Sequence, residues 1–186
     1  MSLPFRRILC YALALSCALG GAPVQGALPP TEYQVKAAYL FNFGQFVEWP
    51  AGSYASASAP FVIGIVGDDP FGSVLDDVVR GEAVAGHPLL VRRFNDTDDV
   101  SACNILFIAR SETALLERTL QAVRGRNVLT VTDAAGDESR DAIIVLKTEN
   151  KRIRMRINIA AARANNLVIS SKLLRPAVVV GAGPGT

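Results

Sequence analysis

Apolar side chains recur every three or four residues between residues 33 and 50, where the chain reads YQVKAAYLFNFGQFVEWP. This spacing predicts a helix that buries one stripe, with Trp49-Pro50 as its end. Six aromatic side chains fall in this stretch, so we expect it to be a central element of the core. The residues predicted to form the buried stripe are Val35, Tyr39, Phe43 and Phe46.

Beyond a Ser/Ala/Gly-rich loop, short apolar runs alternate with helix-like patterns. Strand, helix, strand, helix is the order that a parallel sheet covered by helices requires. The pattern therefore predicts an α/β fold with a single domain, in which a largely parallel central sheet is flanked by helices. Strands are predicted at residues 61–66, 89–93, 105–108 and 128–131, and helices at residues 71–79 and 113–123.

The pattern changes after residue 140 and predicts a C-terminal antiparallel hairpin. Residues 142–147 are an apolar strand, residues 148–150 a turn, and residues 151–157 alternate arginine with apolar side chains. Because successive side chains of a strand point to opposite faces, we expect Arg152, Arg154 and Arg156 in water and Ile153, Met155 and Ile157 on the sheet. Helical turns are predicted at residues 158–163 and 171–175.

The ends of the chain predict export and a frayed terminus. Arg6 and Arg7, an apolar run at residues 8–19 and a small-residue zone at residues 22–27 form a secretory leader pattern. We expect a signal peptide at residues 1–26, an α/β domain at 27–177 without an integral membrane segment, and a flexible tail at 178–186. A lipoprotein site at Cys17 is a poorer match.

The charge of the predicted mature chain is balanced. The sequence has 19 basic and 17 acidic residues, and two of the basic ones leave with the leader. Nothing therefore predicts a nucleic-acid partner. Residues 147–175 nevertheless hold eight basic residues against Glu149 alone. This run is either a set of solvated faces or a basic patch that meets an acidic protein or an anionic surface.

The residue types that catalysis and metal binding need are scarce. His87 is the only histidine and Cys103 the only cysteine outside the leader. A zinc site or a nucleophile-histidine pair would lack members, so we predict no catalytic residue, no metal and no cofactor. We expect Cys103 to be buried beside the strand that follows it, the alternative being a disulfide with another chain.

The segment Gly67-Asp-Asp-Pro-Phe-Gly72 follows a strand and leads into a helix. We interpret it first as a helix start, with Asp68 or Asp69 as the cap and Pro70 at the first helical position. The alternative is a small-ligand crevice beyond the carboxyl end of the strand. Its candidate residues are Gly67, Asp68, Asp69, Phe71 and Gly72.

Several segments together resemble the YfiR family of bacterial periplasmic proteins. The first and last of them are the most specific, and the similarity spans about residues 33–177. The segments are VKAAYLFNFGQFVEWP at 35–50, FVIGIVGDDPFG at 61–72, CNILFIARSE at 103–112, NVLTVTD at 127–133 and RINIAAARANNLVISSKLLRPA at 156–177.

The resemblance implies a homodimeric regulator that acts in the periplasm by contact. In the best-understood member of this family, the protein represses an inner-membrane diguanylate cyclase by binding the periplasmic domain of the cyclase. An outer-membrane peptidoglycan-binding lipoprotein relieves the repression by sequestering the repressor. Loss of the repressor raises cyclic di-GMP and favours biofilm. The redox sensitivity of that member depends on paired cysteines, whereas Cys103 has no partner within the predicted mature chain.

A contact function places the candidate partner-binding surface on the hairpin and the segment after it. The candidate residues are Arg152, Arg154, Arg156, Ile153, Met155, Leu173 and Leu174. A second hypothesis is a periplasmic small-molecule-binding sensor that uses the crevice at residues 67–72. A hydrolase is the least favoured function, because it would need an uncommon set of catalytic residues.

Overall fold

The computed structural model describes residues 29–95 and 99–182. The predicted leader and residues 183–186 of the predicted tail lie outside this range. The helices are α1 (Glu32–Phe46), α2 (Ser73–Val79), α3 (Thr113–Ala122), α4 (Ile159–Ala164) and α5 (Ser171–Leu174). The strands are β1 (Val47–Glu48), β2 (Phe61–Val66), β3 (Ala83–Val84), β4 (His87–Phe94), β5 (Ile105–Ile108), β6 (Leu129–Thr132), β7 (Ile144–Glu149), β8 (Arg152–Asn158), β9 (Val168–Ile169) and β10 (Val178–Val180).

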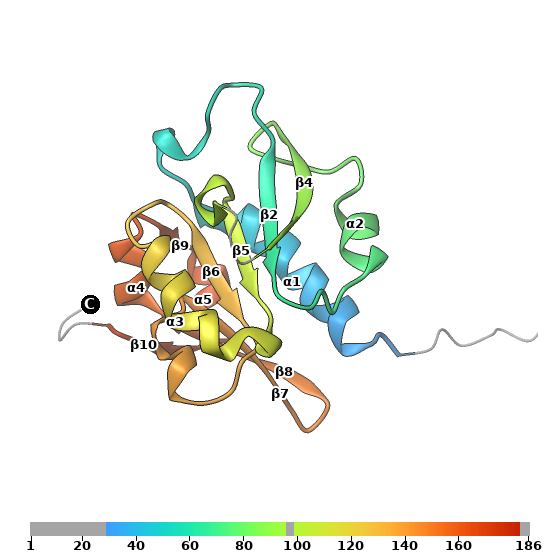
Figure 1. Ribbon diagram of the computed structural model, residues 1–186, viewed down its shortest axis with the longest axis vertical. Helices are drawn as coiled ribbons and strands as arrows, with labels where there is room; N and C mark the ends of the chain where they lie inside the picture. Colours follow the sequence, from blue (N-terminus) through green and yellow to red (C-terminus); the bar gives the residue numbers. More distant parts are fainter. Residues whose placement is uncertain (1–28, 96–98, 183–186) are drawn as a thin grey trace, which may run out of the picture.

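Eight of these strands form one sheet in the order β10-β8-β7-β6-β5-β2-β4-β3 (Figure 1). The run from β4 through β7 is parallel, and β10 is parallel to β8. The β7–β8 hairpin and the β3–β4 pair are antiparallel. The predicted α/β class, parallel sheet and C-terminal hairpin are therefore confirmed. A separate antiparallel pair, β1 with β9, was not predicted.

Two hydrophobic clusters cover the two faces of the sheet. Successive residues of β2 alternate between them: Ile63 belongs to the cluster beneath α1 and α2, and Val62 to the cluster beneath α3. Such alternation follows from the two-residue repeat of a strand. The centre of the sheet is thus buried between helices. Polar side chains therefore lie mainly at its edges and on its projecting hairpin.

Helix α1 forms as predicted, but its end and its buried stripe differ. Thr31 and Gln34 form a capping box at its start, and the helix ends at Phe46, because the next residues pair with β9 as β1. Of the predicted stripe only Phe43 is fully buried, and the remaining predicted positions are half-buried. The fully buried side is centred on the neighbouring positions Lys36, Ala37, Leu40, Phe43 and Gly44.

The start of α2 was predicted wrongly. The helix begins at Ser73 and its N-cap is Gly72, whose φ of 54° lies in the left-handed region that glycine tolerates. Asp69 caps no helix; its Oδ1 accepts a hydrogen bond from the Phe71 amide and so closes a local turn. Pro70 therefore lies in the loop before the helix, not at its first position.

The chain beyond residue 177 is also more ordered than predicted. Residues 178–180 are β10, which pairs with Arg156–Asn158 of β8 at the edge of the sheet. The flexible tail predicted from residue 178 is wrong for these three residues. Three valines suit a strand, and pairing with β8 supplies partners for backbone groups that a tail would leave to water.

Candidate functional site

The β7–β8 hairpin extends beyond the strands beside it (Figure 1). Its apolar residues Met155 and Ile157 are buried in the core, whereas Arg152 and Arg154 are exposed. The hairpin thus presents a row of charged side chains on the face that α1 does not cover. The β7 residues opposite this row are Lys147, which pairs with Arg154, and Glu149, which pairs with Arg152.

The cations on this face meet one carboxylate in the hairpin register, that of Glu149 opposite Arg152. Within residues 29–95 and 99–182, neither Lys147, Arg152 nor Arg154 takes part in an ion pair. The register also sets Lys147 directly opposite Arg154, and like charges opposite each other destabilise a sheet. The hairpin therefore holds a net positive charge, and within the described residues its cations form no ion pair. We call Lys147, Arg152 and Arg154 the basic row.

Arg156 differs from the other two predicted arginines because it serves the fold. Its guanidinium donates to the backbone carbonyl oxygens of Ser139, at 2.6 Å, and Arg140, at 3.2 Å. Burial, followed by the nearby charge of Arg140, lowers the pKa of Arg156. Arg156 thus holds the 3-10 turn at Asp137–Asp141 against β8, and it is not among the solvated arginines that the alternation predicted.

The apolar residues predicted to bind the partner also differ in how far they are buried. Met155 and Leu173 lie in the core and present almost no surface to a partner, which corrects their assignment to the binding surface. Ile153 and Leu174 are half-buried at the edge of that core. The sequence prediction missed Val178, which is 64% exposed and pairs with Arg156 on the neighbouring strand. Its signal, three consecutive valines, lay in the segment assigned to the tail.

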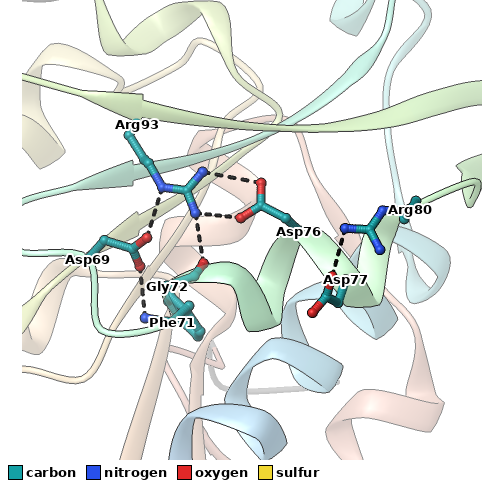
Figure 2. A network of polar contacts seen from close by, with 7 residues as sticks. All are labelled: Asp69, Phe71, Gly72, Asp76, Asp77, Arg80 and Arg93. Carbon is teal, nitrogen blue, oxygen red and sulfur yellow. Dashed lines mark hydrogen bonds and ion pairs between the residues drawn. The ribbon is translucent and has the colours of Figure 1, made fainter.

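The second candidate region, residues 67–72, is held by one arginine from β4. Figure 2 shows the Arg93 guanidinium between two carboxylates and a backbone carbonyl. Arg93 donates to Asp69 Oδ2 at 2.8 Å, to Asp76 Oδ2 at 2.6 Å and to the Gly72 oxygen at 2.8 Å. The bonds to Asp76 and Asp69 raise the pKa of Arg93, and Arg93 lowers that of Asp76. This network joins β4 to the loop and to α2.

The loop uses its own amides and so offers little to an anion. The Asp68 amide donates to Ser111 Oγ at 3.1 Å and the Phe71 amide to Asp69. Gly67, at φ 90°, lies so close to Glu112 and Ser111 that a Cβ would collide with them. The loop is therefore a packed connection between β2 and α2.

A cavity of about 300 Å³ does lie beside this loop. Of the predicted crevice residues, only Asp68 and Asp69 line it; Phe71 is instead buried, edge-on to the rings of Tyr33 and Phe107. The position agrees with the rule that ligand sites of parallel sheets lie beyond the carboxyl ends of the strands. The lining residues are Tyr33, Asp68, Asp69, Pro70, Ala109, Arg110 and Ser111.

Behind this cavity lies a buried charge pair that sequence reasoning missed. The Lys36 side chain is 1% exposed, and its Nζ lies 2.7 Å from Asp133 Oδ2 and 2.5 Å from Glu32 Oε1. Tyr33 donates its hydroxyl to Asp133 as well, and burial together with this bond raises the pKa of Tyr33 to about 12. The signal in the sequence was a lysine in the middle of an aromatic helix.

The remaining reactive residues are held by the fold. Cys103 is buried, its thiol donates to the Val100 oxygen at 3.0 Å, and burial raises its pKa to about 12, which disfavours the thiolate. His87 stacks on Tyr54 with ring centres 3.7 Å apart at the start of β4. Among the residues that the structure describes, no group of histidine, cysteine and carboxylate side chains is suited to a metal ion.

The described part of the chain contains no helix that is both long and apolar enough to cross a membrane. A protein-family model described as YfiR/HmsC-like matches residues 33–178, nearly the whole described domain. A search of curated proteins finds no match. The matched range includes the basic row, the loop at residues 67–72 and the first residue of β10.

Proposed function

Since this chain belongs to the YfiR/HmsC-like family, we propose that it is a periplasmic protein that represses an inner-membrane diguanylate cyclase. It does so by binding the periplasmic domain of the cyclase, and it thereby lowers cyclic di-GMP and biofilm formation. An outer-membrane peptidoglycan-binding lipoprotein releases the cyclase by sequestering the repressor. The protein acts as a homodimer and transforms no substrate.

One observation carries the choice of docking surface: the basic row on the projecting hairpin has a net positive charge and forms no ion pair within the described chain. Unneutralised charge of one sign steers an oppositely charged partner and weakens binding to the wrong one. Val178, which is 64% exposed and pairs with Arg156, adds apolar surface near the row, and Ile153 adds half-buried surface on the opposite face of β8. An acidic face on the cyclase domain fits this combination.

Charge reversal tests the proposal. Deleting the gene should raise cyclic di-GMP, and the double variant Arg152→Glu/Arg154→Glu should mimic the deletion while its melting temperature stays near that of the wild type. The matched control is Arg118→Glu/Arg124→Glu, which makes the same change in net charge at two exposed positions outside the hairpin. Unchanged cyclic di-GMP in the deletion strain would refute the proposal.

The cavity beside residues 67–72 favours one second function, a small-molecule-binding sensor. It has the size of a small ligand and is lined by both acidic and basic side chains. A ligand that binds the folded state must raise the melting temperature. We therefore expect such a sensor to melt higher with a nucleotide or an amino acid, and Asp68→Ala to remove the shift. Melting that ignores both ligand classes would count against this function.

A further inference from the structure

The outer edge of β8 is only half covered. Strand β7 pairs with β8 from Arg152 to Asn158, but β10 pairs with it only from Arg156 to Asn158. In the described chain, the stretch from Arg152 to Met155 has a strand on one side and none on the other. An open stretch of edge strand is a template for another extended segment.

The register shows which backbone groups face this opening. Ile144 pairs with Ile157, and the Asn158 amide donates to the Ile143 oxygen at 2.8 Å. Asn158 and every second residue before it therefore turn their amide and carbonyl toward β7. The residues between them turn theirs outward. Strand β10 lies along that side at Ile157, whereas no described strand lies there at Ile153.

The side chains around the opening specify the chemistry of an occupant. Arg152 and Arg154 project to one face together with Lys147, and Ile153 projects to the other, where it is half-buried. A segment added here would place alternate side chains beside the basic row and beside Ile153. Carboxylates on the first set would neutralise the row and relieve the repulsion between Lys147 and Arg154.

We propose that the edge of β8 from Arg152 to Met155 accepts an extended acidic segment of a protein partner by strand addition. This inference rests on the proposed function, in which the partner is the periplasmic domain of the cyclase, and it adds the mode of contact. A second copy of this chain fits poorly at the same edge. Pairing β8 with β8 would place two rows of arginine on strands only about 5 Å apart.

A model peptide tests the mode of contact directly. The probe is acetylated and amidated Glu-Val-Glu-Val-Glu-Val, with Lys-Val-Lys-Val-Lys-Val as its control, and the readout is backbone amide exchange followed by NMR. We expect the acidic peptide to slow exchange of the Ile153 amide by about tenfold or more, because that amide gains an acceptor. The amides of Arg152 and Arg154, which already face β7, should change less. Binding without protection at Ile153, or no binding of the acidic peptide, would overturn the inference.

A proline variant tests the same contact in cells. Ile153→Pro removes the outward amide and leaves the ladder to β7 intact, as proline is tolerated on an edge strand. Ile153→Ala is the control for the lost side chain, and a thermal melt shows that both variants fold. We expect Ile153→Pro to lose repression and Ile153→Ala to keep most of it.

The two ideas fail separately. If the deletion and Arg152→Glu/Arg154→Glu raise cyclic di-GMP but a folded Ile153→Pro represses like the wild type, strand addition is wrong and the proposed function stands. If the deletion leaves cyclic di-GMP unchanged, the proposed function falls, and protection of Ile153 by the acidic peptide alone decides the inference.

Discussion

Two regions of the same sheet contain arginines that differ in whether the fold supplies them with ion-pair partners. At one end, Arg93 of β4 binds two carboxylates and a carbonyl and fastens a loop and a helix (Figure 2). At the other end, Arg152 and Arg154 of β8 have no ion-pair partner in the described chain. The comparison separates charge that maintains the fold from charge available to a partner, a distinction that residue type alone does not make.

The largest effect on stability should come from Lys36, a deeply buried member of the group of charged residues that maintain the fold. Lys36→Ala leaves the Asp133 carboxylate buried without its cation, and we expect a loss of about 3–5 kcal/mol in the free energy of unfolding. Urea denaturation measures it. The double variant Lys36→Met/Asp133→Leu removes both charges and should recover part of the loss, because Tyr33 and the Arg110 amide then lose their acceptor. A single variant as stable as the wild type would show that Lys36 contributes nothing to the fold.

A smaller loss is expected at Arg93, whose side chain is 43% exposed. Arg93→Ala should cost about 1 kcal/mol, since water screens the ion pairs and replaces part of each hydrogen bond. Differential melting gives the value, with Arg80→Ala as the control because Arg80 pairs with Asp77 on the surface. If both variants melt alike, the network does not fasten the loop to α2.

At the hairpin, by contrast, we expect a substitution to change partner binding more than stability. Arg154→Ala removes a cation that faces Lys147, so we expect stability to change by no more than about 0.5 kcal/mol, in the stabilising direction. Repression should weaken in the same variant, and binding of the isolated cyclase domain should fall as salt rises. Strong destabilisation would place Arg154 with Arg93 among the residues that hold the fold.

The smallest effect is a difference in acid sensitivity. Arg93 holds the pKa of Asp76 below its ordinary value of 3.8. A lowered folded-state pKa contributes stability that is present above the ordinary value and is lost as pH falls through the folded value. Wild-type protein should therefore lose more stability than Arg93→Ala between pH 5 and pH 3, both values being about one unit from that pKa. Equal slopes in pH-dependent denaturation would contradict this.

Local sequence patterns predicted the helices and strands in which apolar residues recur at a regular spacing. The parallel strands, the hairpin and the central helix followed from alternation and helical spacing, and the sheet could be assigned to the α/β class. The resemblance to the YfiR family, confirmed over residues 33–178, was likewise visible in the sequence. These features depend on residues that are close together in the chain or on whole sequence segments, so they can be recognised from the sequence alone.

The features that escaped prediction depend on single distant contacts. Lys36 is buried only because Asp133 arrives from the end of β6, and α2 begins late because Arg93 of β4 holds Asp69 and Gly72 in the preceding loop. Val178 is a strand residue only because β8 offers an edge. The sequence around a charged residue does not indicate whether a distant residue will bind it in the fold. For this reason Arg156 was grouped with Arg152 and Arg154.

The direction of β10 determines where this protein can be handled without disturbing its hairpin. Because β10 runs parallel to β8, Val180 leaves the sheet beside Asn158, about 20 Å along the strand from Arg152. An affinity tag or a fluorescent reporter attached on the C-terminal side of β10 would follow a strand that leaves the sheet at the end of β8 away from Arg152. Immobilisation through that terminus would leave the arginines accessible to a captured cyclase domain, whereas a truncation at residue 177 would strip the sheet of its last strand.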